Sequence, residues 1–263
     1  MTHLSTATTS RRLSVRLAHT AKDLTAVQRL RWRVFFEEMG AAAIAGAADH
    51  IDRDAYDDLC DHLLVIDEDL PGEDAVVGTY RLLRESVADA HTGFYSAGEF
   101  DIGPLTSGSG RVAGELLELG RSCVLAQYRT SATISLLWRG IAEYISHHRI
   151  GLMFGCASFP GTDLSAHAPG LSYLYHNHLA HAASRPRVHL RKGVPLEQLG
   201  RDTYDERRAM FALPPLLKGY LRAGATFGDG AFIDHDFNTI DVCVVLPTAQ
   251  ISDRYAARFS VSA

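Results

Sequence analysis

The residues most able to support chemistry in this chain are Glu118 and Arg121, which flank Gly120 in an otherwise apolar, strand-like segment. On a regular strand, side chains three residues apart point to opposite faces of the sheet, so the two charges would be separated. A bulge at Gly120 would bring both charges to one face and leave backbone N–H groups unpaired. Such a position is suited to holding a thioester. A structural ion pair is the alternative interpretation.

A second candidate group surrounds Arg31, which falls on the apolar stripe of a predicted helix, seven residues after Leu24. A buried guanidinium is costly without a partner, and an acid-rich loop at residues 49–61 supplies Asp54 and Asp57. Arg81 lies in an apolar strand and could pair with the same acids or bind a ligand carboxylate in bidentate fashion. A solvated acidic loop capped by Arg31 remains the alternative.

The elements that must position these residues are strands and helices in mixed order. Thr20 and Asp23 predict the start of a helix that runs to about Met39 and ends at Gly40. Further helices are expected at residues 131–148 and 171–182 and between the Pro214–Pro215 pair and Gly224. Strands are expected at residues 14–18, 60–67, 76–83, around 118, 152–157, 231–234 and 241–246. We expect residues 1–12 to be a disordered tail and residues 13–263 to form a single domain.

Composition excludes several classes of function. The 263 residues, 46% of them hydrophobic, suffice for one large α/β domain. Twenty-six basic and 31 acidic residues give a net charge of -5, which does not favour nucleic acid. With no secretory signal, the four separated cysteines indicate reduced thiols in a cytoplasmic protein. No apolar run approaches the roughly 18 residues of a membrane span, so any membrane contact would be peripheral.

The order of elements resembles the GNAT fold of acyl-coenzyme A and acyl-carrier-protein dependent N-acyltransferases. This resemblance implies an α/β fold with a mixed, mostly antiparallel central sheet of about seven strands flanked by helices. The segments LRWRVF, DRDAYD, GTYRLL and ELGR look like the successive signature blocks of acyl-homoserine-lactone synthases. From Cys60 onward, blocks such as ELGRSCV, LLWRGIAEYI, FGCASFPGTD and LPPLLKGYLRAGATFGDGAFIDHDFNTIDVCVVL are similar to the bacterial L-ornithine N-alpha-acyltransferases of ornithine lipid synthesis.

The resemblance implies transfer of a 3-hydroxyacyl chain from acyl carrier protein to the alpha-amino group of L-ornithine, forming lyso-ornithine lipid without a further cofactor. An acyl-homoserine-lactone synthase-like enzyme and an N-acyltransferase acting on glutamine, lysine or glycine are the alternatives, beside a silent lipid-binding module. Glu118 would remove the ammonium proton, directly or through water, with Arg121 orienting it and keeping it ionised. Tyr220 would protonate the leaving thiolate or simply pack as an aromatic. The implied substrate-binding residues are Arg31, Phe35, Asp54, Asp57 and Arg81.

The turn after the Glu118 strand is the implied binding site for pantetheine. In GNAT enzymes it reads Arg/Gln-x-x-Gly-x-Gly/Ala and binds pyrophosphate at a helix N-terminus. Here residues 129–134 fill both glycine positions with side chains, which favours carrier-protein phosphopantetheine over coenzyme A. The expected pantetheine-binding residues are Ser122, Cys123, Val124, Arg129, Thr130, Ser131 and Ala132.

Docking of an acidic carrier protein on this net-negative chain requires a local basic face. The candidate residues are Arg185, Arg187, Arg191 and Lys192, with Arg129 and Arg139 beside the turn. Because the product is an amphiphile, we also expect peripheral contact with the inner face of the cytoplasmic membrane. The segment LPPLLKGYL would supply it, with Lys218 and Arg222 at the headgroups.

Three further signals are given a structural interpretation. His62 and Asp67 match a His-x-x-x-x-Asp acyltransferase signature but would lie on opposite faces of one strand. The cluster His176, His178 and His181 lacks the spacing of a shared helix face, so no metal site is expected. Cys156 follows an apolar strand without an evident basic activator and is expected to be a core thiol.

Overall fold

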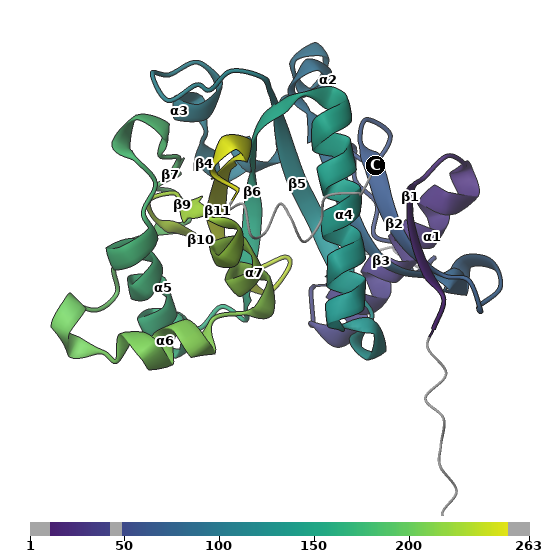
Figure 1. Ribbon diagram of the computed structural model, residues 1–263. Coiled ribbons are helices and arrows are strands. Elements are labelled where there is room, and N and C mark those ends of the chain that lie inside the picture. The colour runs from purple at the N-terminus through teal and green to yellow at the C-terminus, as the bar shows by residue number, and fades with distance from the viewer. Residues whose placement is uncertain (1–10, 43–48, 252–263) are drawn as a thin grey trace, which may run out of the picture.

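The computed structural model describes residues 11–42 and 49–251, which form one curved sheet with helices on both faces (Figure 1). The nine-stranded sheet has the order β1-β2-β3-β5-β6-β11-β10-β8, and β9 pairs with β11 at one side. These strands are β1 (Leu13–Leu17), β2 (Asp61–Asp67), β3 (Val76–Arg84), β5 (Glu115–Val124), β6 (Ile150–Pro160), β8 (Gly193–Val194), β9 (Thr226–Phe227), β10 (Ala231–Asp234) and β11 (Thr239–Pro247). A separate two-stranded sheet joins β4 (Phe100–Asp101) to β7 (Arg187–Val188).

The sheet is antiparallel except where β5 pairs with β6. That parallel pairing runs from Glu115 to Glu118 on β5 and ends at Phe154 on β6, beyond which the two strands have no ladder. Gly155 sits at the point of separation, where an added Cβ would lie 2.2 Å from the carbonyl oxygen of Leu119. Only glycine permits this close approach of the two backbones. The backbones of β5 and β6 are therefore in close contact at Gly155, and beyond this residue a gap opens between the two strands inside the sheet.

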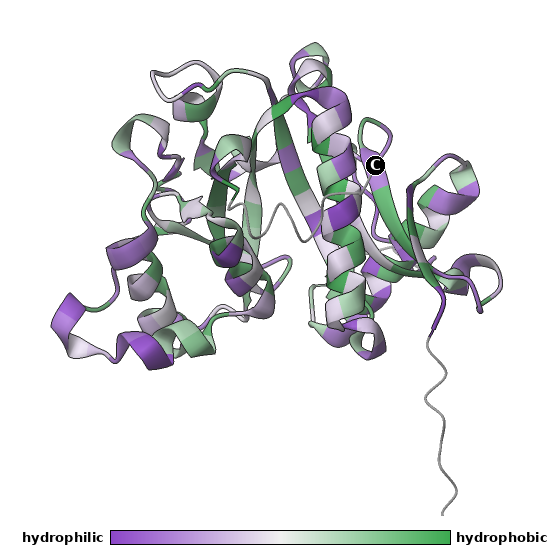
Figure 2. Cartoon of the chain, in the orientation of Figure 1, coloured by the Kyte–Doolittle hydropathy of each residue, from purple (hydrophilic) through white to green (hydrophobic). Residues whose placement is uncertain are grey.

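Two layers of helices cover the sheet. On one face lie α4 (Ser131–His148), α5 (Leu164–His178) and α7 (Pro215–Ala223), whose apolar side chains share one large core with β2, β3 and β5. On the other face, α1 (Ala21–Trp32) packs on β2 and β3, while α2 (Glu85–Ala90) and α3 (Gly103–Thr106) belong to a second cluster. The short helix α6 (Glu206–Ala212) packs on α5. Figure 2 shows hydrophobic and hydrophilic residues alternating along α4, as expected of a helix with one buried face.

Local sequence signals explain the ends of these helices. Thr20 accepts a hydrogen bond from Asp23 N–H while the Asp23 carboxylate accepts from Thr20 N–H, which forms the predicted capping box of α1. After Trp32 the chain continues as a π-helix (Arg33–Glu38) and not as the α-helix to Met39 expected from sequence. Pro215 opens α7, and Gly224 ends it with a left-handed φ of 101°, as predicted.

The GNAT-like fold class is confirmed, with more strands than expected. The predicted sheet of about seven strands has nine because β8 and β9 contribute only two residues each, too few to leave a periodic signal. The helix expected at 171–182 is instead α5, which begins at Leu164 after the Asp163 cap. Most of the expected tail, residues 1–10, lies outside the described residues, whereas Arg12 forms an ion pair with Asp69. Among the helices described, none is long and apolar enough to cross a bilayer.

Candidate active site

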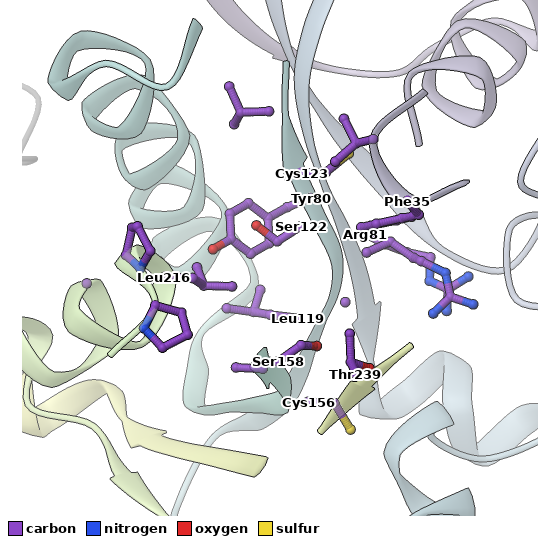
Figure 3. Close-up of a pocket in the computed structure, with 18 of the residues that line it drawn as sticks. Phe35, Tyr80, Arg81, Leu119, Ser122, Cys123, Cys156, Ser158, Leu216 and Thr239 are labelled. Carbon is purple, nitrogen blue, oxygen red and sulfur yellow. The ribbon is translucent and has the colours of Figure 1, made fainter. Parts of the chain in front are cut away.

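A cavity of about 730 Å³ occupies the gap between β5 and β6 (Figure 3). Glu118 and Leu119 are neighbours on β5, and both line it, so the cavity reaches both faces of the sheet. On the α4 and α7 side its walls are largely apolar and include Tyr80, Leu119, Leu137, Trp138, Pro215 and Leu216. On the opposite side they are polar and include Arg81, Glu99, Glu118, Arg121, Asp234 and Asp241.

The predicted bulge on β5 is present, one residue later than expected. Arg81 pairs with Gly120 and Thr79 with Cys123, so Tyr80 faces two residues of β5, Arg121 and Ser122. Arg121 takes the left-handed conformation with φ 48°. Glu118 and Arg121 consequently both line the cavity, as the spacing argument predicted.

The expected pairing of Arg121 with Glu118 is wrong. Arg121 forms ion pairs with Asp52 at 3.4 Å and Asp54 at 3.1 Å, and its guanidinium lies over the rings of Tyr95 and Phe237. The acidic loop supplies stronger partners than a carboxylate three residues away on the same strand.

Glu118 is instead held by the backbone. Its two carboxylate oxygens accept hydrogen bonds from the N–H groups of Tyr95 at 2.9 Å and Ser96 at 2.6 Å, at the start of a 3-10 helix (Tyr95–Gly98). The side chain is buried, and burial raises its pKa above the ordinary value for a glutamate. Glu118 thus combines a fixed orientation with increased basicity when ionised, the properties of a general base.

Arg31 is fully buried, and the acidic loop supplies its partners as predicted. It forms ion pairs with Asp52 at 2.8 Å and Asp57 at 2.6 Å. Arg81 pairs with Asp54 at 2.6 Å and with Asp57 at 3.1 Å. Of the two partners predicted for Arg81, the acids of the loop and a ligand carboxylate, the structure shows the acids of the loop. Arg31, Arg81 and Arg121 therefore balance Asp52, Asp54 and Asp57, a set that we call the arginine–aspartate network.

This network leaves little free carboxylate for a ligand. Asp57 has a side chain only 1% exposed, and Asp54 is 23% exposed. Of the five predicted substrate-binding residues, Phe35 and Arg81 line the cavity, whereas Arg31, Asp54 and Asp57 lie outside its lining. Phe35 comes from the π-helix after α1 and meets Phe237 edge to ring. The network accordingly forms a rigid support behind the polar wall.

Tyr220 does not line the cavity but lies behind Tyr80, which does. Its hydroxyl is 3.5 Å from that of Tyr80, its ring packs edge-on against Trp138, and Tyr80 lines the cavity opposite the bulge (Figure 3). Tyr80 was not among the residues singled out from the sequence, although it lies in the GTYRLL block. Burial raises the pKa of Tyr80, with Ser122 and Tyr220 as its hydrogen-bonding neighbours, so it stays a proton donor at neutral pH.

The predicted pantetheine turn leads from the bulge to the N-terminus of α4. Ser122, Cys123, Val124, Arg129 and Ser131 line the cavity, while Thr130 and Ala132 do not. Thr130 caps the helix by accepting from the N–H of Thr133. Ile134 N–H donates to Thr130 O, which leaves the N–H groups of Ser131 and Ala132 as the open donors of this helix end. The Arg129 guanidinium is held by Glu38 at 2.5 and 2.8 Å.

Comparison with known proteins identifies the family. A model of the acetyltransferase (GNAT) domain matches residues 30–139. An L-ornithine N(alpha)-acyltransferase of Agrobacterium fabrum is 49% identical over 94% of this chain and 85% of its own length. Its counterpart from Brucella abortus is 45% identical over 95% of this chain and 90% of its own length. The chain belongs to the L-ornithine N(alpha)-acyltransferase family. It is therefore an acyltransferase.

Solved structures agree on the fold. FeeM, an N-acyl amino acid synthase from uncultured soil microbes, superposes with a TM-score of 0.52 at 11% identity, over 95% of this chain and all of that chain. BjaI, a coenzyme A-dependent acyl-homoserine lactone synthase, superposes with a TM-score of 0.51 at 16% identity, over 96% of this chain and 92% of that chain. At such identities the likeness shows the fold alone, which is the GNAT fold expected for this acyltransferase family.

The basic residues proposed for docking do not form one face. Arg187 lies on β7, beside β4, whereas Arg129 and Arg139 belong to the N-terminal half of α4 and the turn before it, and Figure 1 shows these regions well apart. In the segment LPPLLKGYL, Leu213, Leu217 and Tyr220 belong to the core, whereas Pro215 is exposed and Leu216 and Leu221 are half-buried. These last three apolar positions are available for the lipid contact expected of the segment.

The three discounted signals have structural partners. His62 contacts the backbone oxygen of Asp57, while Asp67 accepts from the Tyr128 hydroxyl, so the two form no dyad. His176 contacts the backbone oxygen of Leu199, and His178 contacts a tyrosine hydroxyl. Cys156 lines the cavity and is not the core thiol expected from sequence, because it is only half-buried. Its thiol donates a hydrogen bond to Glu99, and burial raises the pKa of the thiol well above the ordinary value, which disfavours the thiolate that a nucleophile requires.

Sequence reasoning missed Glu99, Asp234 and Asp241, three buried acids on the polar side of the cavity. Glu99 follows the turn that holds Glu118, Asp234 ends β10, and Asp241 lies on β11. An aspartate in the apolar run IDVCVVL was the available signal, because a strand buried on both faces does not ordinarily hold a charge.

Proposed function

We propose that the protein transfers an acyl chain from the thioester of acyl carrier protein to the alpha-amino group of L-ornithine, giving lyso-ornithine lipid. The observation that carries this proposal is a cavity with one apolar and one acidic side, joined at the β5 bulge. An acyl thioester suits the first side and a cationic amino acid the second. The family of close relatives, named for ornithine acylation, supports the same acceptor.

The proposed reaction forms a C–N amide bond and breaks a C–S thioester bond. The alpha-ammonium of ornithine must first lose a proton, and ionised Glu118 is placed to accept it directly or through water. The attacked carbonyl develops an oxyanion, for which the N–H groups released by the bulge at Arg121 and Ser122 are the candidate donors. Tyr80 would protonate the departing thiolate, with Tyr220 positioning its hydroxyl, and the second proton that leaves the nitrogen as the amide forms would restore the Tyr80 hydroxyl.

The donor is inferred from the N-terminus of α4. Two open N–H groups, those of Ser131 and Ala132, match the single phosphate of phosphopantetheine better than the pyrophosphate of coenzyme A. The apolar lining by Leu119, Trp138 and Leu216 provides contacts for the arm and the acyl chain.

The carrier protein would approach the end of the cavity at α4 and α7. Arg222 lines the cavity there and, with the exposed Arg139, offers a more suitable basic face than the distant Arg187. The product is an amphiphile, so we include peripheral contact with the cytoplasmic leaflet in the proposal. Ile134, 40% exposed beside the cavity, and Phe211, 61% exposed before α7, are the apolar side chains suited to that contact.

The test supplies purified enzyme with 3-hydroxyacyl carrier protein or 3-hydroxyacyl-coenzyme A, together with ornithine, glutamine, lysine or glycine. We expect an amide at the alpha nitrogen of ornithine, release of free carrier thiol and poor turnover of the coenzyme A thioester. Equal turnover of both donors would contradict the argument from α4, and a preferred acceptor other than ornithine would contradict the proposed substrate.

The role of Glu118 is tested in the same assay. Glu118→Gln keeps its size and one acceptor oxygen for the backbone N–H groups but cannot accept a proton, so kcat should fall about 100-fold or more. Glu143→Gln, a like change on the exposed face of α4, should leave kcat unchanged. If Glu118→Gln stays within a few-fold of the wild type, Glu118 serves only to anchor the turn at Tyr95 and Ser96.

A further inference from the structure

Three carboxylates meet on the polar side of the cavity. One oxygen from each of Glu99, Asp234 and Asp241 lies within 4.8 Å of the other two, and all three residues are buried. They come from distant parts of the chain, and all three line the same cavity as Glu118. We call this group the acidic triad.

The triad differs from the arginine–aspartate network because none of its members forms an ion pair with a lysine or arginine of the described residues. Glu99 accepts a hydrogen bond from the Cys156 thiol at 3.1 Å. One oxygen of Asp234 accepts from the N–H groups of Asp236 and Phe237 at 2.8 and 3.0 Å. These neutral donors orient the carboxylates but do not balance their charge.

Two further polar atoms at this place lack partners. Asp241 Oδ1 and Thr239 Oγ1 are buried, in residues 5% and 3% exposed, and neither makes a hydrogen bond within the described part of the chain. Both residues line the cavity, and Figure 3 shows Thr239 near Cys156 and Ser158. The hydroxyls beside Asp241, those of Ser158 and Thr239, are neutral donors and leave its charge unbalanced, so a buried carboxylate oxygen without a cationic partner faces the cavity.

The charges of the triad are costly while no cation is bound. Burial raises the pKa of Glu99 to about 8, and the charge of Asp241 adds to that shift. Burial likewise raises the pKa of Asp241, with the charge of Asp234 contributing. A bound cation would reverse this cost, because an opposite charge favours the ionised carboxylate.

The triad is joined to Glu118 through one short turn. Ser96 N–H donates to Glu118 at 2.6 Å, the Ser96 hydroxyl lies 3.5 Å from the Cys156 sulfur, and the Cys156 thiol donates to Glu99. Glu118 and Glu99 therefore lie near each other on one wall of the cavity. A ligand with two ammonium groups on a short carbon chain could reach both.

We propose that the acidic triad binds the side-chain ammonium of the acceptor amino acid and so selects a diamino acid whose alpha-amino group lies at Glu118. The inference rests on the proposed function and specifies how the acceptor is recognised. Glu99, Asp234 and Asp241 would surround the ammonium, and the Thr239 hydroxyl could accept one of its N–H groups. A neutral acceptor of the same length would leave the triad unpaired and would bind weakly.

The experiment compares ornithine with norvaline, which has the same carbon chain without the terminal ammonium. Acylation is measured for the wild type, Asp241→Asn and Glu99→Gln, with Asp236→Asn as the control. Asp236 is exposed on the hairpin between β10 and β11, so its substitution makes the same charge change outside the cavity. We expect each triad variant to raise KM for ornithine about 10- to 100-fold. The KM for norvaline should stay within about twofold, and Asp236→Asn should behave as the wild type.

The ratio of the two KM values decides the outcome, because partial loss of folded enzyme changes kcat but not this ratio. An unchanged ratio in both triad variants would overturn the proposal. Loss of activity on treatment with EDTA, restored by Mg²⁺, would overturn it in favour of a metal site. If the wild type acylates norvaline as efficiently as ornithine, the proposed acceptor itself is wrong. If the wild type prefers ornithine and both variants retain that preference, only the assignment of the triad is wrong.

Discussion

Replacing Asp57 with asparagine should destabilise the fold severely while sparing substrate binding. The Asp57 carboxylate accepts hydrogen bonds from Gln28 at 2.9 Å, from Arg31 at 2.6 and 2.9 Å and from Arg81 at 3.1 Å. Asp57→Asn keeps the shape of the side chain but removes the negative charge, leaving the fully buried Arg31 with Asp52 as its remaining acidic partner.

The size of the effect follows from that burial. Breaking a buried ion pair by removing one partner costs about 3–5 kcal/mol, because a charge stays behind without compensation. For a chain of this size, 1 kcal/mol corresponds to a shift of roughly 2–4 °C in Tm, so Tm should fall by about 6–20 °C. Asp58→Asn, the same change at the exposed neighbour, should shift Tm by less than about 2 °C.

Urea unfolding and thermal unfolding, both monitored by circular dichroism in the same buffer, measure the differences in unfolding free energy and in Tm between the variants. The comparison should also depend on pH. Burial opposes ionisation, but the hydrogen bonds and charge of Arg31 prevail and hold the pKa of Asp57 well below its ordinary value. A lowered pKa stabilises the fold above the unfolded-state value of about 3.9, and that contribution is lost as pH falls below it. The gap between wild type and Asp57→Asn should therefore narrow below about pH 4.

An equal and small loss of stability in Asp57→Asn and Asp58→Asn would refute this reasoning. A normal unfolding free energy combined with a raised KM for ornithine would refute it as well, because Asp57 would then bind substrate. The pattern expected is the reverse, with low stability and an unchanged KM in the fraction of enzyme that remains folded.

Three further outcomes follow from the cavity. Because the pKa of Glu99 is raised to about 8, the ligand-free protein should lose stability as pH rises from about 4.5 to 8, and Glu99→Gln should flatten this part of a Tm–pH profile. Tyr80→Phe should lower kcat about 10-fold or more, measured by thiol release, and exceed the effect of Tyr220→Phe, since only Tyr80 lines the cavity; equal effects would contradict the order of the two hydroxyls. Gly155→Ala should lower Tm and acyl transfer together, because its Cβ would meet the backbone oxygen of Leu119 at 2.2 Å, and a variant with wild-type Tm would show that the strands can separate further.

The sequence predicted which charged side chains are buried better than it predicted their ion-pair partners. A guanidinium on the apolar stripe of α1 had to be buried with acids, and Arg31 is. The count from Glu118 to Arg121 likewise required a bulge, which is present. Which acid meets Arg121 depends on how the loop at residues 49–61 folds over β5, a long-range arrangement without periodicity. Sequence spacing therefore suggested Glu118, the nearest carboxylate, and was wrong.

The acidic triad escaped sequence analysis for a related reason. Glu99 and Asp234 are 135 positions apart and each alone reads as a loop or strand-end acid, so the one signal was Asp241 in its apolar run. Only the pairing of β10 with β11 and the packing of the turn at Ser96 bring them together. Tyr80 was overlooked because a tyrosine in a β-strand ordinarily indicates packing, and its exposure to the cavity depends on the bulge of the neighbouring strand.

The separation of β5 and β6 after Glu118 creates two strand edges that face each other inside the molecule. On the outer surface such edges would recruit other chains and promote aggregation, whereas here they border the cavity. A phosphopantetheine arm carries amide groups along a thin chain and could bond to either edge. The binding of the proposed donor would then be largely independent of side chains and would close the sheet across its centre. Substitutions along residues 119–124 could accordingly alter acyl-chain preference while the backbone continues to hold the arm.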